Sequence, residues 1–228
     1  MSEFEVETDL ETTATIKLYY DLALPKDSSG PLPLLIAVHG YGAHKRHMMR
    51  EAKLVVPDGF AIASLQAPYQ HFRATPDGYR VGFGWLTDFR PAESIALHHR
   101  FLLEVISGLS RRGIADPSRV ILYGFSQAAA VNFRFALSFP DLVTGIVAVC
   151  GGIPGDLETN PAFKDSPAKT LYIFGNDDEF YSNEKFAEFD RRLRDRLPNY
   201  RSRQFAAKHE ITNEMRDEIR AFLAGDFQ

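Results

Sequence analysis

The chain has 228 residues, of which 45% are hydrophobic and 25% charged, a balance typical of soluble globular proteins rather than of disordered or fibrous chains. With 26 Lys and Arg against 30 Asp and Glu, the formal net charge is −4, which argues against nucleic acid as a partner. The length and the even composition predict a single domain over residues 1–228.

The N-terminus and the cysteine content predict a cytoplasmic protein. Residues 1–7 are acidic and alternating, whereas a secretory signal begins with basic residues and continues with an apolar core. Cys150 is the single cysteine, and an unpaired thiol is typical of a reducing compartment. No stretch approaches the ~18 consecutive apolar residues of a membrane-spanning helix, so we expect no integral membrane contact.

Apolar runs alternate with helical patterns along the chain. Residues 13–24 alternate imperfectly between apolar and polar side chains, which predicts one or two half-buried strands. Uninterrupted apolar runs, typical of strands covered on both faces, follow at residues 34–38, 60–65, 120–123, 144–149 and 170–174, with a further strand expected over 200–207. Apolar stripes at helical spacing lie at residues 95–109, 186–197 and 211–223. Residues 68–91 show no clear periodicity, and long loops are often functional.

This order of elements predicts an α/β fold. Strands that alternate with helices favour a mostly parallel central sheet with helices on both faces, here with an N-terminal antiparallel strand or hairpin. In such sheets, functional sites lie at the C-terminal ends of the strands.

A serine follows the strand predicted at residues 120–123. The sequence Gly124-Phe125-Ser126-Gln127-Ala128 lies between that strand and a helical segment, which is the context of a nucleophile elbow. The tight turn needs small residues two positions on either side of the serine, and Gly124 and Ala128 supply them. An ordinary strand-to-helix turn with a capping serine is the alternative, and the strand and helix context favours the nucleophile.

A serine nucleophile needs a base and an acid that orients the base. After a nucleophile elbow the acid comes next in the chain and the histidine last. Of the seven histidines, only His209 follows Ser126, so it is the candidate base rather than a surface histidine. Asp177, Asp178 and Glu179 follow the strand predicted at residues 170–174, and the residues alone leave the choice among them open.

A tetrahedral intermediate also needs two backbone N–H donors. One comes from the residue after the nucleophile and the other from the loop after an earlier strand. Gln127 and Tyr41 occupy those positions, and Gly40 and Gly42 would let the second loop approach a substrate. A plain glycine turn at residues 39–42 is the alternative.

Four motifs can be compared with known families: His39-Gly40-Tyr41-Gly42, Gly124-Phe125-Ser126-Gln127, Gly175-Asn176-Asp177-Asp178 and His209. Together they resemble the α/β-hydrolase superfamily, and specifically its phospholipase/carboxylesterase group, which includes acyl-protein thioesterases. The resemblance spans most of the chain and implies that Asp178 is the acid. The chain departs from the group at Ala128 and Lys208, where the group usually or often has Gly, and neither change removes a reacting group.

The resemblance implies a serine hydrolase that cleaves carboxylic esters, including lysophospholipase or thioesterase activity, through an acyl-enzyme on Ser126. It implies a small-molecule ester or thioester substrate, no metal or organic cofactor, and a homodimer as in many relatives. The alternatives are a binding protein on the same fold without turnover, or a peptidase or acyltransferase.

Other residues are weighed against simpler explanations. Trp85 and Phe83 lie in the irregular segment and are candidates for a substrate-binding wall, with local core packing as an equal alternative. Cys150 is expected to be structural. No recognisable ligand spacing surrounds the other histidines, so surface or packing roles and no metal site are expected for His44, His47, His98 and His99.

Overall fold

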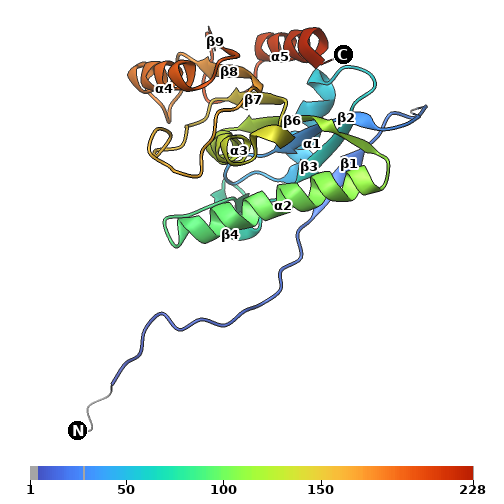
Figure 1. The fold of residues 1–228 in the computed structure, drawn as a ribbon. Coiled ribbons are helices and arrows are strands. Elements are labelled where there is room, and N and C mark those ends of the chain that lie inside the picture. Colours follow the sequence, from blue (N-terminus) through green and yellow to red (C-terminus); the bar gives the residue numbers. More distant parts are fainter. Residues whose placement is uncertain (1–4, 28, 228) are drawn as a thin grey trace.

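The protein is described by a computed structural model that covers residues 5–27 and 29–227. Seven strands form one sheet in the order β1-β3-β2-β6-β7-β8-β9 (Figure 1). β1 is antiparallel to β3, and all other neighbouring strands are parallel. The strands are β1 (Tyr20–Ala23), β2 (Leu32–Val38), β3 (Ala61–Leu65), β6 (Ala115–Phe125), β7 (Gly145–Val149), β8 (Lys169–Gly175) and β9 (Tyr200–Phe205).

Helices cover both faces of this sheet. Alternate residues of a strand point to opposite faces, so β2 places Leu35 and Ala37 in one buried cluster and Leu34 and Ile36 in another. The first cluster lies under α1 (Lys45–Val55) and α5 (Asn213–Phe227). The second lies under α2 (Pro91–Arg111), α3 (Gln127–Ser138) and α4 (Asn183–Arg196), and a short 3₁₀ helix spans Pro140–Leu142. The predicted α/β architecture, a mostly parallel sheet with helices on both faces and an antiparallel N-terminal strand, is confirmed.

The segment predicted to lack regular structure forms a hairpin instead. β4 (Tyr69–Thr75) pairs with β5 (Gly78–Gly84) in an antiparallel ribbon that is separate from the main sheet. Most of its residues are exposed or half-buried, so no alternation of buried and polar residues marks it in the sequence. The apolar pattern of the sequence does not predict α1 either, because the few apolar residues that α1 buries lie among charged residues.

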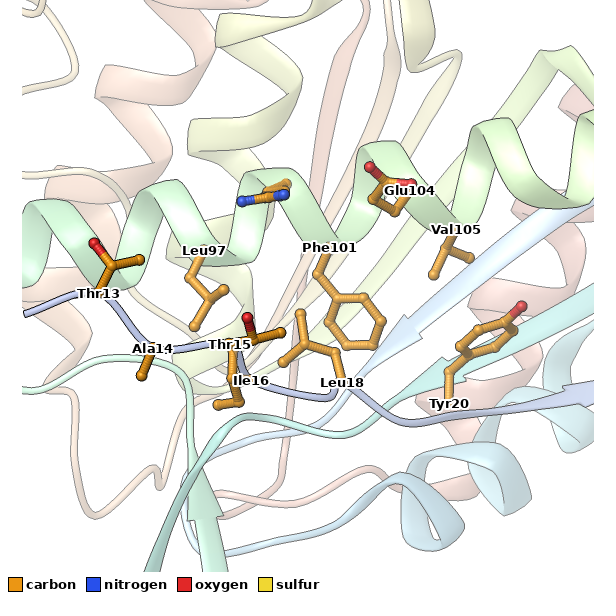
Figure 2. Close-up of a pocket in the computed structure, with 11 residues that line it drawn as sticks. Thr13, Ala14, Thr15, Ile16, Leu18, Tyr20, Leu97, Phe101, Glu104 and Val105 are labelled. Atoms are coloured by element: carbon orange, nitrogen blue, oxygen red, sulfur yellow. The ribbon is translucent and has the colours of Figure 1, made fainter.

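The N-terminal region forms one strand, where the sequence predicts one or two. β1 pairs its four residues with residues 62–65, and the chain before Tyr20 runs past the end of the short strand β3. Residues 13–16 and Leu18 instead lie beside α2, where they line an open groove of about 510 Å³ with Leu97, Phe101 and Val105 (Figure 2). Within the described residues, no helix is both long enough and apolar enough to cross a bilayer.

Candidate active site

Ser126, Asp178 and His209 all follow the C-terminal ends of parallel strands. Ser126 follows β6, Asp178 follows β8, and His209 follows β9. Neighbouring parallel strands end at the same edge of a sheet, so residues far apart in sequence are brought together there.

Ser126 occupies a strained turn between β6 and α3. Its φ of 57° and ψ of −121° are unusual for a residue with a side chain, as expected of a nucleophile elbow. Its N–H donates to the carbonyl of Val149 on β7 at 2.9 Å, which holds the turn against the neighbouring strand. A Cβ on Gly124 would lie 2.7 Å from Nδ2 of Asn132 and 3.1 Å from the carbonyl carbon of Ala128, so a side chain there would crowd the first turn of α3.

The three side chains form a hydrogen-bonded chain. His209 Nε2 lies 2.9 Å from Ser126 Oγ, and His209 Nδ1 lies 2.7 Å from Asp178 Oδ2. The other oxygen of Asp178 accepts the backbone N–H groups of Phe180 and Tyr181 at 2.8 and 3.1 Å. The Asp178 side chain is 0% exposed and that of His209 is 12% exposed. An ionised Asp178 keeps the imidazole proton on Nδ1, which leaves Nε2 free to accept the serine proton.

The other two candidate acids make different contacts. Asp177 is exposed, and its N–H donates to the carbonyl of Ala207 at 3.0 Å. Glu179 accepts the backbone N–H of His209 at 3.0 Å, so it holds the histidine loop rather than the imidazole ring. A Cβ on Gly175 would lie 2.2 Å from the Ala207 carbonyl oxygen, so this glycine lets the two loops meet. The sequence marked Glu179 only as a competing acid.

Three aromatic rings surround the imidazole of His209. The ring centroids of Phe180, Phe125 and Tyr181 lie 4.6, 4.9 and 6.3 Å from it. Together with the rest of the site, these rings leave only 12% of the His209 side chain exposed. Nothing in their spacing distinguishes them from ordinary core aromatics, so sequence reasoning did not identify them.

Two backbone N–H groups beside Ser126 are available to a ligand. Gln127 is the first residue of α3 and Tyr41 follows β2; among the described residues, neither backbone N–H has a hydrogen-bond acceptor. A Cβ on Gly40 would lie 3.1 Å from the Ser126 Cβ, so the loop after β2 packs against the elbow. The N-terminus of α3 adds the partial positive charge of its helix dipole. Such a site suits an anionic oxygen.

Trp85 is buried in the core, where only 1% of it is exposed. Its indole N–H donates to the carbonyl of His39 at 2.7 Å, and its ring packs edge-on against His98. This burial favours core packing over direct contact with a substrate. Phe83 is half-buried beside the same cluster, and its contact with a substrate stays a prediction.

Buried histidines lie behind the site. Burial lowers the pKa of His98 to about 3 and the pKa of His39 to about 4. Both side chains are therefore neutral near pH 7. His39 Nε2 accepts the backbone N–H of Ala67 at 3.1 Å, so its polar atoms serve the structure of this loop.

Cys150 lies next to the hydrogen-bonded chain. Its sulfur and donor atoms of Asp178 and His209 lie within 4.8 Å of one another, a grouping that could hold a metal ion. Burial raises the pKa of the Cys150 thiol to about 12, so the thiolate that a metal prefers is disfavoured. Asp178 and His209 are also bound to each other. These contacts fit a structural thiol better than a metal ligand.

Residues 25–225 match the family described as Phospholipase/Carboxylesterase. The chain belongs to this family. The match includes Ser126, Asp178 and His209, and it agrees with the resemblance indicated by the motifs.

Two curated proteins are similar to part of this chain. NocK of Nocardia uniformis subsp. tsuyamanensis is 29% identical over 150 residues, which cover 64% of this chain and 40% of NocK. The uncharacterized hydrolase YNR064C of Saccharomyces cerevisiae is 29% identical over 119 residues, covering 52% of this chain and 34% of that protein. The chain therefore spans well under half the length of the curated relatives it matches.

Solved structures share the fold across most of both chains. Esterase PE8 superposes with a TM-score of 0.74 at 24% identity, covering 93% of this chain and 100% of that one. Acyl-protein thioesterase 2 of Zea mays superposes with a TM-score of 0.71 at 15% identity, covering 92% of this chain and 99% of that one. The carboxylesterase of Bacillus cereus superposes with a TM-score of 0.69 at 16% identity, covering 92% of this chain and 95% of that one.

The two departures from the family pattern are accommodated without altering these contacts. Ala128 is fully buried beneath the elbow, close to Gly124. The Lys208 side chain is 71% exposed, and its Nζ lies 3.9 Å from Oε1 of Glu179. The Glu179 carboxylate also accepts the backbone N–H of His209. Neither side chain comes between the serine and the histidine, which are in direct hydrogen-bond contact.

Proposed function

We propose that this protein is a serine hydrolase that cleaves carboxylic esters through an acyl-enzyme on Ser126. The observation that carries the proposal is the continuous chain from Ser126 Oγ to His209 Nε2 at 2.9 Å and from His209 Nδ1 to Asp178 at 2.7 Å. Membership of the phospholipase/carboxylesterase family supports the same chemistry.

In the acylation step His209 takes the proton of Ser126 Oγ as the oxygen attacks the acyl carbon. The carbonyl oxygen becomes an oxyanion and accepts hydrogen bonds from the N–H groups of Tyr41 and Gln127. Asp178 stays ionised and stabilises the imidazolium. The tetrahedral intermediate then collapses: His209 returns the proton to the leaving oxygen or sulfur, which departs as an alcohol or thiol.

Water completes the reaction. His209 removes a proton from water, and the resulting nucleophile attacks the acyl carbon of the ester on Ser126. A second tetrahedral intermediate breaks down to a carboxylic acid, and the serine recovers its proton from His209. No step of this mechanism requires a metal or an organic cofactor.

The proposed substrates are small esters or thioesters, including lysophospholipids. Proteins whose solved structures share this fold include an esterase, a carboxylesterase and an acyl-protein thioesterase, which supports acyl esters as the substrate class. The cytoplasmic location and the homodimer stay predictions. So does a contribution of Phe83 to substrate binding.

Hydrolysis of p-nitrophenyl esters from acetate to palmitate tests the proposal. The intact protein should turn over, and its preferred chain length reports the size of the acyl site. Ser126→Ala, checked for folding by circular dichroism, should release no p-nitrophenol above the uncatalysed rate. Equal rates for the two proteins would overturn the serine mechanism. Absence of turnover in both would favour a binding protein, and transfer of the acyl group to added alcohols or amines would indicate an acyltransferase.

A further inference from the structure

The two proposed oxyanion donors belong to separate parts of the chain but contact one short segment. Tyr41 lies on the loop after β2, and Gln127 begins α3. Residues 83–86, at the end of the β4–β5 hairpin, are hydrogen-bonded to the Gln127 side chain. They are also hydrogen-bonded to His39 and Gly42, which lie before and after Tyr41 in the loop. We call residues 83–86 the bridging segment.

The side chain of Gln127 makes the first connection. Its Oε1 accepts the backbone N–H of Trp85 at 2.8 Å, and its Nε2 donates to the carbonyl of Leu86 at 3.0 Å. The amide group therefore satisfies one backbone N–H and one backbone carbonyl of the bridging segment. With both ends engaged, this side chain is better suited to positioning its own backbone than to binding a substrate.

The loop after β2 makes the second connection. The N–H of Gly42 donates to the carbonyl of Phe83 at 2.8 Å, and the Trp85 indole N–H donates to the carbonyl of His39 at 2.7 Å. These bonds hold the residues on both sides of Tyr41. The Tyr41 ring also stacks on His71 of β4, with centroids 4.5 Å apart.

We propose that the bridging segment sets the spacing between the two oxyanion donors, and that the Gln127 side chain and Trp85 are positioning residues for the reaction. The inference rests on the proposed function. Hydrogen-bond donors stabilise an oxyanion only when they lie about 2.7–3.1 Å from the place where the charge develops. A small shift of one donor would therefore weaken the transition state much more than the bound substrate.

Gln127→Met tests the first connection. Methionine has nearly the same length as glutamine and retains the backbone N–H, but it cannot pair with Trp85 and Leu86. We expect kcat to fall about 10- to 100-fold with KM within about threefold of the wild-type value, because a displaced donor retains part of its effect. Gln204→Met on β9 is the matched control, since the Gln204 amide bonds Asn183 at the surface. It should retain wild-type kcat.

Gly82→Ala tests the second connection from the other side. A Cβ at this position would lie 3.0 Å from both Cα and O of Gly42, so the hairpin and the loop after β2 must move apart. We expect a similar fall in kcat. Gly108→Ala on α2 is the control, because a Cβ there has no atom of the described structure within 4 Å.

An alkyl trifluoromethyl ketone provides the deciding readout. It adds to an active serine as a hemiketal whose oxygen occupies the oxyanion position. Both test variants should lose affinity for the ketone by the same factor as kcat/KM, and circular dichroism should show that both remain folded at the assay temperature. Wild-type kcat in both variants, or lower kcat with unchanged ketone affinity, would overturn the positioning role alone. A wild-type protein that neither hydrolyses esters nor binds the ketone would overturn the proposed function itself.

Discussion

Ser126 and Cys150 adopt positive φ angles at the ends of two adjacent strands. Their φ values are 57° and 47°, in a region that costs a residue with a side chain on the order of 1–3 kcal/mol. Each N–H donates to the next strand in the sheet, Ser126 to Val149 at 2.9 Å and Cys150 to Ile173 at 2.8 Å. A Cβ on Gly151 would lie 2.3 Å from the Ser126 carbonyl oxygen, so the strained turns also require a glycine beside them.

Replacement of the hydrogen-bonded acid should remove most of the activity. Asp178→Asn presents an amide to His209 Nδ1 and favours the tautomer whose proton lies on Nε2, which cannot accept the serine proton. We expect kcat for p-nitrophenyl acetate to fall by about 10⁴-fold. Asp177→Asn, the same chemical change at the preceding residue of the same loop, should keep nearly full activity. A large loss with Asp177→Asn and none with Asp178→Asn would reassign the acid.

At the scale of elements, an ion pair joins the two helices on one face of the sheet. Arg216 of α5 places Nε 2.8 Å and Nη2 3.1 Å from the two carboxylate oxygens of Glu51 on α1. The side chains are 20% and 11% exposed, so water screens this pair little. The Arg216–Glu51 ion pair therefore links α5 to α1 in addition to the apolar packing between these helices.

Loss of one partner should destabilise the protein more than loss of both. Arg216→Met leaves the Glu51 carboxylate unpaired in a largely buried place, and we expect the free energy of unfolding to fall by about 2–3 kcal/mol. The double variant Glu51→Met/Arg216→Met should recover much of this loss. The exposed pair Arg220–Asp217 is the control, where Arg220→Met should cost less than about 1 kcal/mol. Urea denaturation of the wild type and these three variants measures the losses, and a double variant that is less stable than Arg216→Met would contradict this account.

At the scale of the whole molecule, three buried or half-buried histidines couple folding to pH. Burial lowers the pKa of His98 from 6.5 to about 3, and that of His39 and His99 from 6.5 to about 4. At pH values between 6.5 and these lowered pKa values, the unfolded chain binds protons on these histidines that the folded protein does not. The free energy of unfolding therefore falls as the pH falls from 6.5 towards 4, by about 1.4 kcal/mol per pH unit for each such proton.

The melting temperature should decrease progressively from pH 6.5 to pH 4.5. His98→Gln should make this decrease shallower, because one of the three groups is removed. A His98→Gln curve parallel to the wild type would show that His98 is not linked to folding.

Much of the fold could be predicted because buried parallel strands leave a local signal. The apolar runs at residues 34–38 and 120–123 correspond to β2 and β6, since strands covered on both faces carry little polar alternation. The hairpin β4–β5 could not be predicted, because its faces are largely exposed and its pairing depends on register. One or two strands are predicted over residues 13–24, but only the four residues of β1 form a strand, because β3 pairs with no residue before Tyr20.

The amino-acid sequence by itself determined an α/β architecture with a mostly parallel sheet, the strand–turn–helix context of Ser126, and the single histidine that follows it in the chain. Each depends on local spacing and chain order. Only the tertiary structure decided that Asp178, among three adjacent carboxylates, meets His209, that Trp85 is buried, and that the Gln127 amide pairs with the bridging segment. These contacts join residues about 30 or more positions apart, and side-chain direction at the end of a strand is set by the neighbours that packing brings there.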